Sequence, residues 1–415
     1  MHKVLQRLQL PRAARVVTVA GTNGKGSTVA ILEALYSAMG RRVACYTSPH
    51  VIRFNERMRV AGQDLADAEI VSALQIVEAA RGDTPLTFFE FGTLAAFVAF
   101  AAANADVHIL EIGLGGRLDA VNALDPDGAI ICNVSLDHCA WLGNDVETIA
   151  REKAGVMREA IPVVFGAAKV PASVLEIAAT TGAELLVADR DFHADSHGPA
   201  SDSQWSFTYR DQAPLVLKKP SLTGAFQLHN AAGALALFFA LEGSRSLAPK
   251  AISAALSSLR VSGRMQSLYT DRHWLLDVAH NPASAEVLGL ELASRNLGGK
   301  LVAVVGVLAD KDLAGMLKPL LPLVDAWVAV TPHGPRALQA RELAGSIAAL
   351  GDTPCWIAES IDAGLTIASR IAGSDDLILV TGSFYTVGPA LEKLGSEAGH
   401  GVGYTRGAAN QQEKG

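Results

Sequence analysis

Cysteine is scarce in this sequence, and the few cysteines present show no pairing pattern. None lies in C-x-x-C spacing, which argues against a zinc site or a thiol-redox motif. Such usage is typical of a chain that folds without disulfides in a reducing compartment, so we expect these residues to be small core side chains. The four positions are Cys45, Cys132, Cys139 and Cys355.

Long hydrophobic runs and basic runs are also missing. The longest apolar run, at residues 91–103, is shorter than the roughly 20 residues that a membrane helix needs. A net charge of −7 without any basic run argues against nucleic acid or an anionic membrane surface as a partner. Half of the 415 residues are hydrophobic and 19% are charged, which suits two or three packed domains. We therefore expect a soluble, cytoplasmic protein.

The most informative stretch is a glycine-rich loop, GTNGKGS, at residues 21–27. The apolar residues 16–20 before it predict a buried parallel strand, and helical spacing up to Met39 predicts a helix after it. Such a loop binds phosphate, because unpaired N–H groups and the helix dipole attract an anion, and Lys25 adds a positive charge. An ordinary glycine-rich turn is the alternative, since Val19 and Gly26 depart from the general P-loop pattern.

Polar side chains follow three further predicted strands. These are residues 42–47 before Ser48, residues 107–110 before Glu111, and residues 129–134 before His138. The carboxyl ends of parallel strands meet at one edge of a sheet, where open sheets bind ligands. A carboxylate at that edge is a candidate for Mg²⁺, although a histidine taken alone is more often a satisfied core residue.

Two helices carry residues that have competing interpretations. A helix over 88–103 has Thr87 as its N-cap and Glu90 as its third residue, and this capping box explains Glu90 at least as well as catalysis does. A helix over 146–157 carries Lys153, and a charge at such a position is usually part of a solvated face. The aperiodic segment 53–57 is interpreted as a loop.

The second part of the chain repeats the alternation of strands and helices. Short strands and helices alternate over 162–217, the pattern breaks around residues 262–266, and further strands are expected at 274–278, 301–305, 326–330 and 377–380. We expect domains at 1–264 and 265–395, followed by a polar, glycine-rich tail at 396–415 that is disordered.

Ten motifs in chain order carry a resemblance that covers nearly the whole chain. They are GTNGKGS, YTSPH, RFNER, TFFEF, LEIGLGGRLDA, NVSLDH, IAREKAG, GRMQ, DVAHNP and TGSFYTVG. Together they resemble the bacterial folylpolyglutamate synthase/dihydrofolate synthases of the Mur ligase superfamily. The resemblance implies an α/β fold, with a P-loop ATPase domain around a central, mostly parallel sheet. It also implies a smaller Rossmann-like C-terminal glutamate-ligase domain and an active site in the cleft between the two.

The same resemblance implies roles for matching residues. Nucleotide contacts fall on Asn23, Gly24, Lys25, Gly26, Asn230, Arg264 and Asp277. Metal ligands fall on Ser48, Glu111 and His138. The pterin site falls on Thr87, Phe88, Phe89, Glu90, Leu118, Asp119 and Ala120. The catalytic set is Lys25, Lys153, Glu111, His138 and His280, with Asn281 and Ser383 beside it. In this family the lysine that matches Lys153 is carbamylated.

The implied reaction is the ATP-dependent joining of L-glutamate to the carboxylate of a folate or of dihydropteroate, through an acyl phosphate. It implies Mg²⁺, with two sites, a possible role for a monovalent cation, and a monomeric enzyme. Family members carry some tens of residues before the first strand, including a segment that helps to bind the pterin, whereas 15 residues precede Val16 here. On that basis we expect reduced folates to be extended better than dihydropteroate.

Three other functions are weighed against this one. Another Mur-type ligase, acting on a cell-wall precursor, is disfavoured by the FFEF and GGRLDA segments. A P-loop kinase or ATPase that uses only the first domain is disfavoured by DVAHNP and TGSFYTVG in the second. A non-enzymatic nucleotide-binding module would not need Glu111, His138 and Lys153 together.

Overall fold

The structure is a computed structural model that describes residues 1–196, 203–295 and 297–397. The chain divides into two compact units, with the boundary between Ser262 and Gly263. Nearly all of the expected disordered tail, 396–415, lies outside the described residues. Across the part of the chain that is described, no helix has both the length and the apolar character to cross a membrane.

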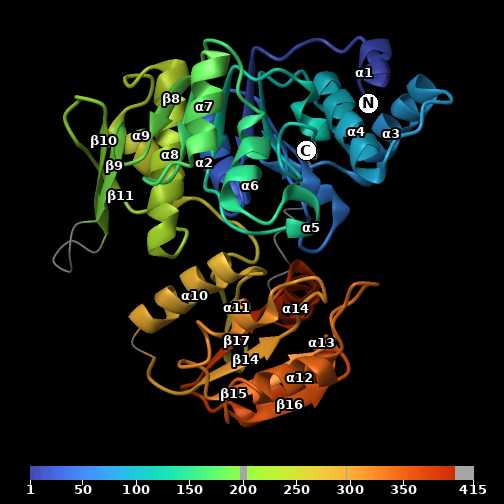
Figure 1. Ribbon diagram of the computed structural model, residues 1–415, viewed down its shortest axis with the longest axis vertical. Coiled ribbons are helices and arrows are strands. Elements are labelled where there is room, and N and C mark those ends of the chain that lie inside the picture. The colour runs from blue at the N-terminus through green and yellow to red at the C-terminus, as the bar shows by residue number, and fades with distance from the viewer. Residues whose placement is uncertain (197–202, 296, 398–415) are drawn as a thin grey trace, which may run out of the picture. The chain divides into compact units, whose positions relative to one another are not determined.

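The N-terminal unit, coloured blue to yellow in Figure 1, is built on one main sheet, whose strands among the described residues follow the order β4-β3-β2-β5-β1-β6-β7-β8. In that order, the neighbours from β2 through β5, β1, β6 and β7 to β8 pair parallel. Strands β3 and β4 extend the sheet beyond β2 in antiparallel pairing. The carboxyl ends of β1, β2, β5 and β6 therefore meet at one edge. The strands are β1 (Arg15–Ala20), β2 (Val43–Tyr46), β3 (Met58–Val60), β4 (Gln63–Asp64), β5 (Val107–Glu111), β6 (Gly128–Ile131), β7 (Pro162–Phe165) and β8 (Glu184–Val187).

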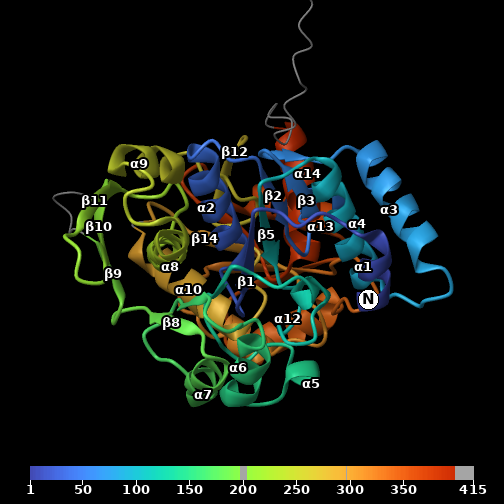
Figure 2. The ribbon, with the colours of Figure 1, turned by 90° about the horizontal axis from the view of Figure 1, so that it is seen from above.

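Helices cover both faces of this sheet, because its central strands are apolar on both sides (Figure 2). Val17 and Val19 belong to a core shared with α2, α8 and α9, whereas Val16 and Ala20 belong to a core shared with α1, α3, α4, α6 and α7. The helices are α1 (His2–Leu8), α2 (Lys25–Ala38), α3 (Asp67–Arg81), α4 (Phe88–Ala102), α5 (Cys139–Leu142), α6 (Val146–Ala154), α7 (Ala172–Thr181), α8 (Ala225–Glu242) and α9 (Pro249–Ser257), with 3₁₀ turns η1 (Phe54–Arg57) and η2 (Ala120–Ala123).

A second, small sheet of the N-terminal unit lies in the region where the sequence predicts only alternating short elements. Its strands β9 (Phe192–Ser196), β10 (Gln204–Tyr209) and β11 (Leu215–Lys218) pair antiparallel in the order β11-β10-β9. The inward side chains Trp205 and Phe207 are fully buried in the same core as α8 and α9, so this sheet covers those helices.

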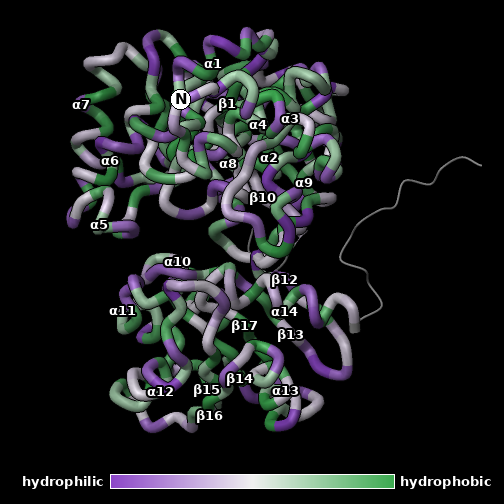
Figure 3. The backbone as a smooth tube through the Cα atoms, turned by 90° about the vertical axis from the view of Figure 1, so that its right-hand side faces the viewer, coloured by the Kyte–Doolittle hydropathy of each residue, from purple (hydrophilic) through white to green (hydrophobic). Residues whose placement is uncertain are grey.

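The C-terminal unit is a second α/β layer structure, with described strands in the order β12-β13-β17-β14-β15-β16. All neighbours pair parallel except β12, which pairs antiparallel with β13. Its central strands run through hydrophobic stretches of the chain (Figure 3). The elements are β12 (Gln266–Tyr269), β13 (His273–Leu276), α10 (Pro282–Ser294), β14 (Leu301–Val305), α11 (Leu313–Leu317), β15 (Ala326–Val330), α12 (Ala340–Ala348), β16 (Cys355–Ala358), α13 (Ile361–Ile371), β17 (Leu377–Thr381) and α14 (Phe384–Glu397).

Three expectations from the sequence are corrected by the structure. Segment 53–57 is not a plain loop, because residues 54–57 form η1, capped by Arg53, and lead directly into β3. The strand predicted over 129–134 ends at Ile131: Cys132 N still donates to Ala20 of β1, but from Asn133 onward the backbone bonds to the phosphate loop. Cys45 and Cys132 are buried as expected, but Cys139 and Cys355 are only partly buried.

Candidate active site

The phosphate loop connects β1 to α2 at the carboxyl edge of the N-terminal sheet. Gly24 has φ +85° and forms the N-cap of α2, which begins at Lys25. The left-handed conformation at Gly24 explains the glycine there, because other residues adopt it only with strain. A Cβ at Gly26 would meet nothing within 4 Å, so packing does not explain that second glycine. The first-turn N–H groups of α2 and the open space at Gly26 together suit an anion.

Two lysines from distant segments converge on one carbonyl of this loop. The Lys25 ammonium donates to the Gly21 and Thr22 carbonyls at 3.0 and 3.1 Å, and the Lys153 ammonium donates to the Gly21 carbonyl at 3.0 Å. Lys153 is only 4% exposed, so the solvated-helix interpretation is wrong. Burial first, and then the charge of Lys25, lower the pKa of Lys153 to about 7.

The glycine loop after β5 fixes where Lys153 lies. Arg117 N donates to the carbonyl of Glu152 at 2.8 Å, and a Cβ at Gly116 would lie 2.7 Å from that carbonyl oxygen. The backbone of the loop therefore crosses the last turn of α6 in direct contact, which only a glycine at 116 allows.

Asn230 on α8 lies against the phosphate loop although some two hundred residues separate them in sequence. A Cβ at Gly24 would come within 2.6 Å of the Asn230 Oδ1. Asn230 Nδ2 donates to Gln227 Oε1 at 3.0 Å, and Gln227 Nε2 donates to Ser27 Oγ at 3.3 Å. Sequence reasoning missed Gln227; the signal was a pair of amides three residues apart on an otherwise apolar helix.

Two of the three expected metal ligands lie together. Ser48 N donates to Glu111 Oε2 at 3.2 Å, because β2 and β5 are paired neighbours, and Glu111 is buried. His138 lies beyond β6, with a left-handed φ of 51°, and its backbone N–H donates to Asp137 Oδ1 at 2.8 Å. Its imidazole is exposed, so the core-histidine interpretation is wrong. Within the described ranges, no three His, Cys, Asp or Glu side chains form a ready metal cluster.

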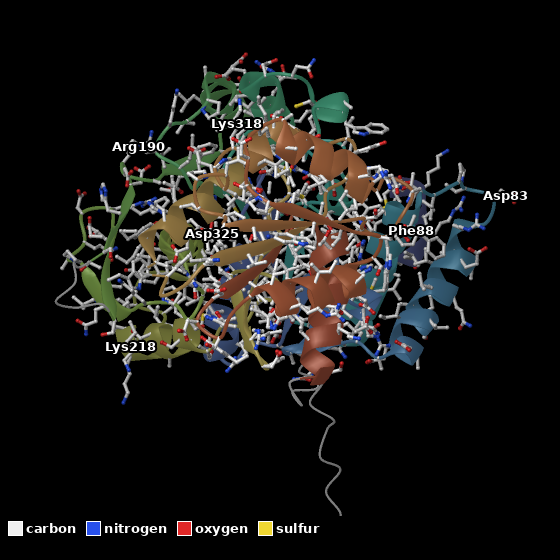
Figure 4. The ribbon with its side chains drawn as sticks, turned by 90° about the horizontal axis from the view of Figure 1, so that it is seen from below. Asp83, Phe88, Arg190, Lys218, Lys318 and Asp325 are labelled. Carbon is white, nitrogen blue, oxygen red and sulfur yellow. The ribbon has the colours of Figure 1, made fainter. Side chains whose placement is uncertain are left out.

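The residues expected around the pterin divide into exposed side chains and structural ones. Thr87 and Glu90 form the predicted capping box: Glu90 N donates to Thr87 Oγ1 at 3.2 Å, and Thr87 N donates to Glu90 Oε2 at 2.8 Å. Phe88 is 73% exposed at the surface of this unit (Figure 4) and makes a T-shaped contact with the Phe54 ring, 6.1 Å between centroids. Phe89 instead covers Gly113, where a Cβ would lie 2.4 Å from the ring.

The Leu118–Asp119–Ala120 segment shows the same division. Asp119 accepts the N–H groups of Leu114 and Val121 at 2.8 and 2.9 Å, so its carboxylate closes the loop that presents Leu118. Burial raises the pKa of Asp119, while these N–H bonds oppose that shift. Leu118 is 79% exposed, and Ala120 is buried at the start of η2.

In the C-terminal unit, the expected residues gather at the carboxyl ends of β13 and β17, which are adjacent. Asp277 is buried and accepts the N–H groups of Met265 and Ala279, both at 2.9 Å. Burial raises its pKa, and the positive charge of Arg264 opposes that shift. The Asp277 carboxylate therefore fixes the backbone next to Arg264.

Arg264 and His280 both contact one aromatic ring, Phe384. The Arg264 guanidinium lies 5.4 Å from the ring centroid, and the His280 ring lies 5.7 Å from it. His280 Nδ1 lies 2.9 Å from the Val278 carbonyl, which fixes the orientation of the imidazole. Phe384 lies inside the TGSFYTVG motif, but the sequence alone predicts no role for it.

Asn281 and Ser383 are bound within the fold. Asn281 caps α10 by accepting the N–H of Ser284 at 2.9 Å. Ser383 is buried and donates to the Gly306 carbonyl at 3.0 Å. Both side chains shape this edge of the C-terminal sheet.

The comparisons with known proteins first define the class. The profile of the Mur ligase middle domain matches residues 19–238, and that of the Mur ligase glutamate ligase domain matches residues 263–384. The fold and the phosphate loop are thus those of an ATP-dependent Mur-type ligase.

Individual relatives define the protein further. The chain is 38% identical over 387 residues to the dihydrofolate synthase/folylpolyglutamate synthase of Escherichia coli, covering 93% of this chain and 88% of that one. The folylpolyglutamate synthase of Lacticaseibacillus casei is 35% identical over 78% of each chain. The E. coli FolC structure with DHPP and ADP matches with a TM-score of 0.88 at 37% identity, covering 95% and 92% of the two chains. The Yersinia pestis enzyme with Mn, AMPPNP and L-glutamate bound matches with a TM-score of 0.86 at 40% identity, covering 95% and 93%. The chain belongs to the dihydrofolate synthase/folylpolyglutamate synthases, the ATP-dependent glutamate ligases of the Mur ligase family.

Proposed function

We propose that this ligase joins the amino group of L-glutamate to the carboxylate of dihydropteroate or of a reduced folate, through an acyl phosphate. The observation that carries the proposal is the convergence of Lys25 and Lys153 on the Gly21 carbonyl, at a phosphate loop whose neighbouring strand end holds Glu111. The relatives support the substrates, since the E. coli structure contains DHPP with ADP and the Y. pestis structure contains AMPPNP with L-glutamate.

Phosphoryl transfer needs positioning and neutralisation of charge more than covalent chemistry from the protein. Lys25 and the N–H groups at residues 24–26 bind the phosphates of ATP in this proposal, with Asn230 beside them. Arg264 and Asp277 are proposed nucleotide contacts in the C-terminal unit, and His280 is a proposed catalytic residue. The acceptor carboxylate attacks the γ-phosphorus and ADP leaves. The glutamate amine then attacks the carbonyl carbon, and inorganic phosphate leaves in place of oxide.

The donor set at the carboxyl edge fits Mg²⁺. Glu111 offers a buried carboxylate, and Ser48, whose backbone N–H bonds to that carboxylate, offers a hydroxyl; such hard oxygen donors suit this ion, and His138 adds a nitrogen. We assign these three residues as the ligands that would hold Mg²⁺, with two sites expected, and the Y. pestis structure contains Mn. When bound, the ion neutralises the charge of the triphosphate.

Lys153 is proposed to carry a carbamate. Its buried Nζ has a pKa near 7, so a large fraction of the amine is neutral at pH 7 and can add to CO₂ with loss of one proton. The reaction converts an ammonium into an anionic oxygen donor, which is compatible with a neighbouring divalent ion and with Lys25.

The acceptor is proposed to lie against Phe88 and Leu118, whose exposed apolar faces suit a flat heterocycle. Phe89 and Ala120 shape the floor, whereas Thr87, Glu90 and Asp119 act by holding the backbone that presents those faces.

An assay of ATP turnover with and without each co-substrate tests the proposal. ADP and phosphate should form at appreciable rate only when acceptor and L-glutamate are both present, and the acceptor should gain one glutamyl residue by mass. ATP turnover that does not depend on acceptor or L-glutamate would instead support a P-loop ATPase. A stable phosphorylated acceptor would support a kinase. Static light scattering tests the expected monomer.

A further inference from the structure

The carboxamide of Asn133 makes a reciprocal pair with the backbone of Asn23 in the phosphate loop. Asn133 Oδ1 accepts the Asn23 N–H at 3.0 Å, and Asn133 Nδ2 donates to the Asn23 carbonyl at 3.0 Å. The side chain thus binds both polar groups of one loop residue, as a neighbouring strand would. The backbone takes part as well, since Thr22 N donates to the Asn133 carbonyl at 3.0 Å.

Two residues further along, Ser135 binds the same loop through its backbone. Thr22 Oγ1 donates to the Ser135 carbonyl at 3.2 Å and accepts the Ser135 N–H at 3.0 Å. Thr22 is buried, so these bonds form away from water. We call the Asn133 side chain, the Asn133 carbonyl and the Ser135 backbone the loop clamp.

The clamp acts directly beside the atoms that bind phosphate. Asn23 precedes Gly24, the N-cap of α2, so fixing both polar groups of Asn23 fixes the entry to the first helical turn. Gly21 approaches the clamp segment closely, because a Cβ there would lie 3.0 Å from Cys132 Cβ. A loop that is already ordered loses less conformational entropy when a ligand binds.

The clamp also explains why β6 ends at Ile131. From Asn133 onward the hydrogen bonds go to the phosphate loop, and the same segment then continues to Asp137 and His138. The clamp therefore links the nucleotide loop to the segment that carries a proposed metal ligand.

We infer that Asn133 is a positioning residue for nucleotide binding, which preorganises the phosphate loop through its reciprocal hydrogen bonds with Asn23. The inference rests on the proposed function, because it assumes that this loop binds the phosphates of ATP. Asn133 acts through the backbone of the loop, so its removal weakens nucleotide binding and leaves the affinity for glutamate unchanged.

The test compares nucleotide affinity with stability in the full chain. Asn133→Ala removes both side-chain bonds and keeps the backbone bond. The dissociation constants of ADP and AMPPNP, measured calorimetrically with Mg²⁺, should rise about tenfold. The KM for ATP should rise by the same factor, while the KM for glutamate stays within about twofold. Thr22→Val removes the hydroxyl bonds to Ser135 and should act the same way, and Thr22→Ser should restore affinity.

Asn55→Ala is the matched control. The buried carboxamide of Asn55 donates to the Leu65 carbonyl at 2.8 Å and to Asp67 Oδ1 at 2.7 Å, away from the phosphate loop. Its loss should lower the melting temperature without changing the affinity for ADP. If Asn133→Ala binds ADP as tightly as the parent does, with or without a lower melting temperature, the positioning role is wrong. A parent protein that binds neither nucleotide contradicts the proposed function itself.

Discussion

Replacement of Gly26 by alanine separates phosphate binding from folding with a single methyl group. Gly26 is the second residue of α2, lacks a positive φ, and has open space where its Cβ would be. Alanine is a better helix former than glycine, so Gly26→Ala should stabilise the fold by about 0.5 kcal/mol, up to ~1 kcal/mol. For a unit of this size that is a rise of about 1–3 °C in melting temperature.

Activity should move in the opposite direction. In the proposed site the added methyl group occupies the space that the nucleotide phosphates need beside Lys25. We expect kcat/KM for ATP to fall about 100-fold, equivalent to ~2.7 kcal/mol of transition-state stabilisation. Steady-state ligation and thermal unfolding, measured on the same preparation, give both numbers.

Two other glycines provide the controls. Gly345 lies inside α12 and also has open space at its Cβ position, so Gly345→Ala should stabilise the C-terminal unit and leave ligation unchanged. Gly24→Ala should instead destabilise by about 1–2 kcal/mol, because Gly24 has φ +85° and its Cβ would meet Asn230. A Gly26→Ala variant that keeps parental activity would refute the assignment of this loop to phosphate.

Three further predictions address charged groups. Lys25→Ala should lose ligation by well over tenfold (~1.4 kcal/mol) at an unchanged melting temperature, and activity within tenfold of the parent would contradict the role of Lys25. Lys153→Ala should lose most activity, and added short carboxylic acids should partly restore it. If Lys153→Ala keeps parental activity in CO₂-depleted buffer, the role of a carbamate at Lys153 is wrong. His108 is buried against Phe100, and burial lowers its pKa from 6.5 to about 4. The folded state therefore resists its protonation, so the parent should lose on the order of 3 kcal/mol of stability as the pH falls from about 6.5 to 4. Chemical denaturation across that range should show a smaller loss for His108→Leu, and equal losses would contradict this origin.

Much of the fold follows from local patterns in the sequence. Apolar β-branched runs such as residues 16–20, 301–305 and 326–330 lie in the strands they predict, because strands covered on both faces need little else. The capping box at Thr87 and Glu90 is equally local, and the structure contains it.

Contacts between distant segments could not be predicted in that way. Lys153 has the sequence environment of a surface lysine, and only the packing of α6 beneath the glycine loop buries it. The end of β6 was missed because Asn133 pairs with a loop some hundred residues earlier. The contacts of Asn230 with the phosphate loop and of Phe384 with Arg264 and His280 likewise depend on tertiary structure.

The central claim is that ATP activates the acceptor carboxylate as an acyl phosphate before glutamate attacks. The most direct test uses acceptor with ¹⁸O in its reacting carboxylate and follows the label during one round of ligation. Because the carboxylate oxygen bonds to the γ-phosphorus and leaves with it, one ¹⁸O per turnover should appear in inorganic phosphate by mass spectrometry. Ligated product formed together with unlabelled phosphate would contradict the account.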